Sequence, residues 1–150
     1  KFFIFSSIYG DILKKKYFEI GKKFIHIHPG KLPEYKGSTT FYYELLNENK
    51  FTFTGIFLNK KIDSGQVIDS HRYNLLKMKN FDKSKLDLVY DPYFRSLLLF
   101  KIFKNLKKKK LYKKIKKKKY KIFQPYYIIH PVLKHLSILK KWNLLVKLEH

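Results

Sequence analysis

The sequence contains no cysteine and no alanine among its 150 residues. The absence of cysteine excludes disulfide bonds, zinc–thiolate centres and a cysteine nucleophile, and it allows a reducing compartment. No apolar run approaches the roughly 18 residues that a membrane-spanning helix needs, and the first residues lack the pattern of a signal peptide. A chain of this length has the size of one domain and can bury a substantial core. These features predict one cytoplasmic domain without covalent cross-links.

Arginine is scarce, although the chain is strongly basic. Arg72 and Arg95 are the only arginines among 34 basic residues, and the formal net charge is +23. Such a charge favours polyanionic partners, because clustered cations release counterions from phosphates. Evolved phosphate recognition, however, tends to use the guanidinium fork of arginine. The abundance of Lys, Ile, Phe, Tyr and Asn is also typical of a genome rich in A and T. Nucleic acid therefore stays open as a partner but is not favoured.

Hydrophobic periodicity alternates between strands and helices through the first hundred residues. Strands are expected at 1–7, 24–28, 51–59 and 67–75, and helices within 8–23 and at 38–50 and 91–106. Ser38 or Thr39 is expected to cap the second of these helices and Asp91 the third. The alternation is typical of α/β folds. The first two strands, joined by a helix, predict a right-handed parallel crossover in a mostly parallel sheet.

The segment from Lys101 to Lys121 contains 13 lysines and no acidic residue. We interpret it as a solvated helix face or an excursion, and the alternative is a surface that attracts phosphorylated substrates or RNA. A Pro break and a terminal helix follow within 120–142. The last residues, 148–150, resemble the start of a vector-encoded histidine tag and are set aside. The expected division is a core at 1–106, a Lys-rich segment with a C-terminal helix at 107–147, and this remnant.

The junction FIHIHPGKLPEYKG, residues 24–37, places two histidines at the end of a strand. His26 and His28 point to the same side, because side chains alternate along a strand. Pro29 and Gly30 then end the ladder, which leaves an imidazole at a sheet edge where parallel folds bind ligands. Asp63 lies in a later strand-end turn, KKIDSGQVI. A carboxylate near an imidazole orients the ring and stabilises its protonated form, as a general acid or base requires.

HIHPGKLPEYKG, followed by a helix, a strand and KKIDSGQVI, resembles the catalytic core of the folate-dependent formyltransferase family. That family has an Asn-x-His-Pro-Ser/Gly-x-x-Pro-x-Tyr-Arg/Lys-Gly loop and a later Leu/Ile-Asp-x-Gly turn. SSIYGDIL is similar to the family segment that lines the folate pocket, and YDPYFRSLLL to a helix that follows the core. The resemblance covers about residues 2–105. It implies the C-terminal half of a Rossmann-like domain, without the family's amino-terminal half.

The resemblance also implies roles for individual residues in formyl transfer from N10-formyltetrahydrofolate to an amine. His28 would polarise the formyl carbonyl or relay protons, and Asp63 would partner it. The folate would be lined by Tyr9, Gly10, Asp11, Ile12, Leu13, Asn59, Lys60, Lys61, Ile62 and Asp63. The acceptor would be bound by Pro29, Gly30, Tyr35, Lys36 and Gly37. Stabilisation of the tetrahedral oxyanion should dominate the rate, since one lost donor typically costs about 3 to 4 kcal/mol.

One position departs from the family pattern. His26 stands where the family has Asn, whose amide donates to the oxyanion; a histidine can donate too, but its ring is larger and its charge adds pH dependence. Altered or lost activity, and hence a non-catalytic scaffold, is an alternative. A metal site of His26, His28 and Asp63 is a further alternative. The Pro and Gly pattern is explained better by the transferase loop, so no metal is expected.

The acceptor is expected to be a small amine, since the Pro-Gly pair and the aromatic continuation STTFYY resemble the family branch that includes enzymes acting on nucleotide-linked amino sugars. A methionyl-tRNA formyltransferase-like activity and a basic RNA-binding module with a degenerate core are the alternatives. A homodimer stays open.

Overall fold

The computed structural model describes residues 2–4, 13–61, 63–73, 82–107 and 123–146. The strands are β1 (Phe2–Ile4), β2 (Lys23–Pro29), β3 (Phe51–Phe57) and β4 (Gln66–Tyr73). The α-helices are α1 (Thr40–Glu48), α2 (Asp91–Lys107) and α3 (Pro131–Val146). A 3-10 turn at Lys15–Glu19, another at Lys83–Lys85 and a π-helical turn at Leu86–Tyr90 complete the elements. Each of the four predicted strands and the predicted helices at 38–50 and 91–106 is therefore present, with shorter or shifted ends.

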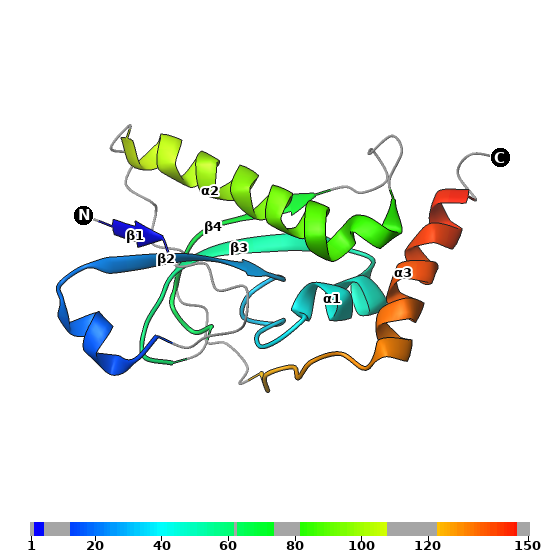
Figure 1. Ribbon diagram of the computed structural model, residues 1–150, viewed down its shortest axis with the longest axis horizontal. Coiled ribbons are helices and arrows are strands. Elements are labelled where there is room, and N and C mark those ends of the chain that lie inside the picture. The colour runs from blue at the N-terminus through cyan, green and yellow to red at the C-terminus, as the bar shows by residue number, and fades with distance from the viewer. Residues whose placement is uncertain (1, 5–12, 62, 74–81, 108–122, 147–150) are drawn as a thin grey trace.

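The four strands form one sheet in the order β1-β2-β3-β4 (Figure 1). β1 pairs with β2 in parallel, as predicted, whereas β2–β3 and β3–β4 are antiparallel. The expectation of a mostly parallel, Rossmann-like sheet is therefore wrong for the described strands. The reason lies in the connection from β2 to β3: α1 returns the chain to the edge where β2 ends, and Pro29 pairs with Phe53 near the start of β3.

Helix α2 covers one face of the sheet, where the larger part of the core lies (Figure 1). Phe94, Leu98 and Ile102 of this helix are at most 5% exposed. Phe53 of β3 contacts Phe94, and a Cβ at Gly55 would meet Ile102, so odd-numbered positions of β3 face α2. The alternation of a strand then places Thr52 and Thr54 on the opposite face.

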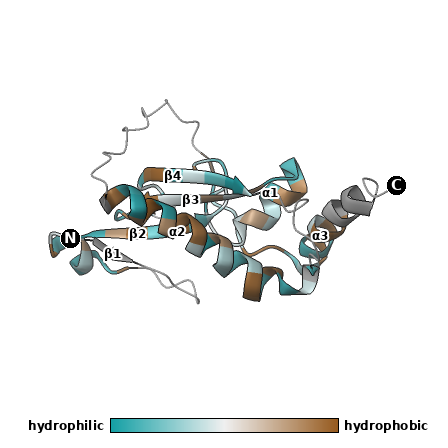
Figure 2. Ribbon diagram, turned by 90° about the horizontal axis from the view of Figure 1, so that it is seen from above, coloured by the Kyte–Doolittle hydropathy of each residue, from teal (hydrophilic) through white to brown (hydrophobic). Residues whose placement is uncertain are grey.

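The opposite face meets helix α1 and the loop that precedes it. Glu44 of α1 is fully buried, and its carboxylate accepts hydrogen bonds from the backbone N–H and the hydroxyl of Thr52. Helix α3 packs beside α1 at the end of the molecule (Figure 2). Ile129, just before α3, belongs to the same hydrophobic cluster as α1, α2 and the sheet.

Two expected helix features differ in the structure. In the described part of the expected helix at 8–23, the helical residues form only a 3-10 turn at Lys15–Glu19, which buries no side chain. Thr39 occupies the N-cap position of α1, but it makes no side-chain capping bond. Its hydroxyl instead accepts a bond from the N–H of Ile129 at 2.8 Å. Thr39 therefore ties α1 to the segment before α3 and does not cap its own helix.

Residues 101–107 of the Lys-rich segment belong to α2, whereas residues 108–121 and the expected tag remnant at 148–150 lie outside the described residues. Among the described helices, none combines the length and hydrophobicity needed to cross a lipid bilayer. The cytoplasmic location inferred from composition stays a prediction.

Candidate active site

Strand β2 directs His26 and His28 toward the face of the sheet opposite α2. Ile27 lies on the α2 side, since its side chain would contact a Cβ placed on Gly55, so its two neighbours point the other way. His28 pairs with Thr54 across the β2–β3 ladder. His28 is 2% exposed, whereas His26 is half-buried. The predicted orientation of the two imidazoles to one side is thus confirmed.

The loop after β2 is anchored to β3 by backbone and hydroxyl groups. Gly30 has a φ of 136°, and a Cβ there would lie 2.9 Å from the hydroxyl oxygen of Thr40. The N–H of Gly30 donates to the carbonyl of Thr52 at 2.8 Å. The hydroxyl of Thr54 donates to the carbonyl of Gly30 at 2.8 Å and accepts from the N–H of Leu32 at 3.3 Å. Glycine at position 30 is required both by the backbone conformation and by the close approach of Thr40.

The far end of the loop is held by a segment almost ninety residues away in the sequence. Gly37 and Tyr126 form a parallel bridge, in which Tyr126 donates its N–H to Lys36 at 2.8 Å and Ser38 donates to the carbonyl of Tyr126 at 2.9 Å. The ring of Tyr126 stacks on Tyr35, with 5.6 Å between centroids. A Cβ on Gly37 would lie 2.3 Å from the carbonyl oxygen of Tyr126. The loop therefore has a fixed backbone at both ends.

Asp63 reaches this loop from the turn between β3 and β4. β2 and β3 are antiparallel, so this turn follows the end of β3 that lies beside Ile25, away from the end of β2. The turn is tight, since a Cβ on Gly65 would overlap the carbonyl of Phe57. Asp63 has a φ of 47°. The predicted meeting of His28 and Asp63 does occur, but through a turn that folds back, and not because two parallel strands end at one edge.

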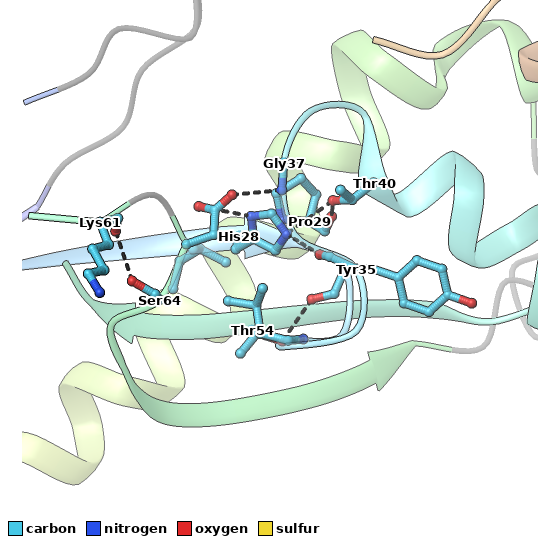
Figure 3. Close-up of polar contacts among 12 residues, drawn as sticks. His28, Pro29, Tyr35, Gly37, Thr40, Thr54, Lys61 and Ser64 are labelled. Carbon is cyan, nitrogen blue, oxygen red and sulfur yellow. Dashed lines mark hydrogen bonds and ion pairs between the residues drawn. The ribbon is translucent and has the colours of Figure 1, made fainter. Parts of the chain in front are cut away.

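His28 lies between Asp63 on one side and the loop on the other (Figure 3). Its Nδ1 is 3.5 Å from Oδ1 of Asp63. Its Nε2 is 2.6 Å from the carbonyl oxygen of Tyr35 and 3.1 Å from the hydroxyl oxygen of Thr40. Because a carbonyl oxygen only accepts, Nε2 carries a hydrogen. Thr40 donates its own hydrogen to the carbonyl of Pro29, so its oxygen also accepts at Nε2.

The carboxylate of Asp63 is held from two directions. Oδ2 accepts a hydrogen bond from the N–H of Gly37 at 2.8 Å, and Oδ1 faces His28. Burial disfavours ionisation, but the hydrogen bond and charge of His28, together with the Gly37 N–H, outweigh it and lower the pKa of Asp63 below its ordinary value. The carboxylate is thus ionised, and it orients the imidazole of His28. This arrangement can serve general acid–base chemistry.

The residues expected to line the folate are described only in part. Tyr9, Gly10, Asp11, Ile12 and Ile62 lie outside the described residues. Leu13 is half-buried, and the other three, Asn59, Lys60 and Lys61, are exposed in the turn that carries Asp63. The side-chain oxygen of Asn59 accepts from the N–H of Lys61 at 2.9 Å, and its amide donates to Ser64 at 3.0 Å. Asn59 therefore shapes the turn, which leaves this stretch of chain on the surface.

The residues expected to bind the acceptor all belong to the loop after His28. Pro29, Lys36 and Gly37 are half-buried and Gly30 is buried. The ring of Tyr35 points away from His28 (Figure 3), and its hydroxyl donates to Glu48 at 2.9 Å. Tyr35 thus reaches the site through its backbone carbonyl.

Three contributors to the site were not identified from the sequence. Thr40 contacts His28 directly, and Tyr126 closes the loop. Arg95 of α2 donates to the carbonyl of Ile27 at 2.8 Å while it pairs with Asp91 at 2.9 Å, which joins α2 to β2 next to His28. The i, i+4 spacing of Asp91 and Arg95 could have indicated the ion pair. Nothing local to Tyr126 indicates its partner.

The chain matches no protein-family model. It is 33% identical over 79 residues to the methionyl-tRNA formyltransferase of Pelagibacter ubique, a match that covers 51% of this chain and 24% of the relative. Its fold is similar to that of a 4-N formyltransferase from Francisella tularensis, with a TM-score of 0.61, 16% identity and coverage of 93% of this chain and 59% of the other.

A second structure with a similar fold is the formyltransferase PseJ from Anoxybacillus kamchatkensis, solved with a formamido sugar nucleotide and tetrahydrofolate. It has a TM-score of 0.52 and 15% identity, with coverage of 69% of this chain and 52% of PseJ. The chain spans about a quarter of the curated relative and somewhat more than half of these two structures. The resemblance to formyltransferases inferred from the two motifs is thus confirmed in sequence and in fold.

Proposed function

We propose that this chain is part of an enzyme that transfers a formyl group from N10-formyltetrahydrofolate to an amine. The observation that carries the proposal is the pair formed by His28 and Asp63, 3.5 Å apart, on the two motifs that resemble the formyltransferase loop and turn. The similarity to formyltransferases supports the reaction class. The tetrahydrofolate bound to PseJ supports the donor. The turn at Asn59–Lys61, next to Asp63, is exposed, so such a donor can approach it.

The donor supplies an activated formyl carbon, and the residues of this chain manage charge and protons around it. The amine would lose a proton as its nitrogen bonds to the formyl carbon, and the formyl oxygen would gain negative charge. The bond between that carbon and N10 of the donor would then break, and N10 would take up a proton and leave as tetrahydrofolate. A protonated His28 offers positive charge to that oxygen, while ionised Asp63 keeps the ring oriented and balances its charge. Tyr35 and Thr40 fix the opposite edge of the ring. His26, half-buried on the same face, is the second candidate donor to the oxyanion.

The proposed acceptor is a small amine, with a nucleotide-linked amino sugar as the leading candidate. The Pro29–Gly30 pair and the aromatic start of α1 favour it, and the fold resembles enzymes of that kind, including PseJ with its sugar nucleotide. Methionyl-tRNA is the second candidate, because the curated relative acts, by its name, on that acceptor. A homodimer and a cytoplasmic location belong to the same proposal.

The first test measures formyl transfer by the full-length protein. With N10-formyltetrahydrofolate and an amino-sugar nucleotide, the formylated product should appear by mass spectrometry. His28→Ala should reduce kcat by about 10²- to 10⁴-fold, the range of a general acid or base. The matched control is His71→Ala, which removes an exposed histidine from β4. Undiminished turnover in His28→Ala would reject the assigned roles.

Two further measurements identify the acceptor and distinguish a formyltransferase from an RNA-binding module. Methionyl-tRNA replaces the sugar nucleotide in the same assay, and the ratio of the two kcat/KM values decides between the acceptors. A basic RNA-binding module without catalysis predicts instead that no product forms, and that RNA affinity falls steeply with salt and survives Asp63→Asn.

A further inference from the structure

We propose that His26, His28 and Asp63 form a binding site for a zinc-like divalent metal ion. These three side chains each present one ligand atom, and the three atoms lie within 4.8 Å of one another. Two imidazoles and one carboxylate, with a fourth position left to water, are a ligand set that zinc uses in proteins. The inference rests on the geometry of this chain and does not depend on the proposed reaction.

The separations are compatible with a tetrahedral ion after a small adjustment. Ligand atoms about 2.0 to 2.1 Å from zinc lie about 3.3 Å from one another. Nδ1 of His28 and Oδ1 of Asp63 are already 3.5 Å apart. The full set must contract by about 1.5 Å at most. His26 is half-buried, and the centroid of its ring lies 6.4 Å from that of His28.

The other contacts of His28 and Asp63 resemble those of metal-binding residues. A metal-bound histidine usually donates its other ring N–H to a carbonyl or a carboxylate, which fixes the tautomer. His28 has this arrangement: Nε2–H donates to the carbonyl of Tyr35 at 2.6 Å, so the neutral form of the ring has its lone pair on Nδ1, which faces Asp63. Gly37 holds Oδ2 of Asp63, and Oδ1 therefore remains for an ion.

The lone pair of Nδ1 and the carboxylate oxygen of Asp63, 3.5 Å apart, repel each other unless a cation lies between them, either a proton or a metal ion. His26 decides which cation this chain can hold. The formyltransferase motif described above has Asn at this position, which leaves only one imidazole, whereas His26 adds a second nitrogen ligand. An ion bound there would occupy the atoms of His28 and Asp63 that proton transfer needs, so it would inhibit formyl transfer.

The test titrates ZnCl₂ into the full-length protein, without an affinity tag and after dialysis against a chelator. Isothermal titration calorimetry should give one ion per chain, and Zn²⁺ should raise Tm, since the ion binds only the folded state. CoCl₂ should produce the visible absorption of a four-coordinate site. His26→Asn and Asp63→Asn should each weaken Zn²⁺ binding more than the roughly 10- to 100-fold expected for losing a group that merely supports a ligand.

His71→Asn is the matched control, because it removes an exposed histidine outside the cluster and should leave the Zn²⁺ affinity unchanged. Circular dichroism of each variant excludes misfolding as the cause of lost binding. Stoichiometric binding that depends on His26 supports the site even if no acceptor is ever formylated. Equal Zn²⁺ affinity in the wild type and His26→Asn, or no heat and no Tm shift with Zn²⁺, would overturn it whatever the transfer assay gives.

Discussion

At the scale of single residues, Glu44 is a carboxyl group placed in the core. It is fully buried between α1 and β3, and burial raises its pKa above the ordinary value of 4.5 even though the hydrogen bonds from Thr52 oppose the shift. A raised pKa in the folded state means that the contribution of Glu44 to stability is full below about pH 4.5 and declines as the pH rises through the shifted value. Ionised Glu44 is therefore a cost at neutral pH.

We expect Glu44→Gln to gain stability relative to the wild type as the pH increases from about 4 to 7. Urea unfolding followed by circular dichroism at both pH values measures the difference. Glu48→Gln is the control of opposite sign, because the hydrogen bond from Lys50 lowers the pKa of Glu48. That variant should lose stability relative to the wild type over the same interval. The same pH trend in both variants would contradict the assignment.

The sequence identifies the residues of the site only where a motif specifies them. His28 and Asp63 follow from the loop and the turn, and their proximity is confirmed. Thr40 does not follow, because the serine and threonine before α1 are equally suited to capping, and only the folded loop selects Thr40 for His28. The burial of Glu44 does not follow from the sequence either, since a glutamate on an amphipathic helix is normally exposed.

At the scale of elements, the loop between β2 and α1 depends on the segment that precedes α3. Gly37 has a φ of 106° and lies so close to Tyr126 that a Cβ would be 2.3 Å from its carbonyl oxygen. The same glycine donates its N–H to Asp63. One backbone position thus joins the loop, the β3–β4 turn and the C-terminal segment.

Gly37→Ala should separate these elements. Amide hydrogen exchange of Ser38 and Tyr126, which donate the bonds of the bridge, should accelerate, and stability should fall by more than the roughly 1 to 2 kcal/mol of left-handed backbone strain. Gly21→Ala is the matched control: its φ is 67°, but no atom lies within 4 Å of the added Cβ. Gly21→Ala should lose only the stability that corresponds to backbone strain. Equal losses in both variants would mean that the contact with Tyr126 contributes nothing.

Strand positions are predictable from alternation, but strand direction is not. The residues of β3 read as a strand in either orientation, and the direction follows from the short return through α1. The antiparallel direction of β3 does not separate His28 from Asp63. The turn between β3 and β4 folds back and brings Asp63 to His28 from the other end of β3. The two motifs predict that His28 and Asp63 are close together, but they do not predict the course of the chain between them.

At the scale of the whole molecule, one hydrophobic cluster includes residues from β2, β3, α1, α2 and the segment before α3. Such a shared core predicts that these elements unfold together. The backbone amide signals of α3 (Pro131–Val146) in nuclear magnetic resonance spectra report on that helix. Far-ultraviolet circular dichroism reports on all the elements. The two transitions in urea should coincide.

Leu98→Ala should lower the free energy of unfolding by about 2 to 5 kcal/mol, since Leu98 is 0% exposed in the centre of α2. Both probes should shift to the same new midpoint. Leu97→Ala, one position away and 40% exposed, should change stability by only about 0.5 kcal/mol. A midpoint of the α3 amide signals that stays in place while the dichroism midpoint moves would show that α3 unfolds separately.

The bridge between Gly37 and Tyr126 also sets an order of events during synthesis. The histidines and the turn of Asp63 leave the ribosome well before Tyr126 does, so the nascent chain carries both motifs while the loop still lacks its closing partner. The imidazole and carboxylate can approach each other at that stage, but the backbone of the loop acquires its final pairing only when the later segment emerges. Closure of the candidate site therefore has to follow the synthesis of Tyr126.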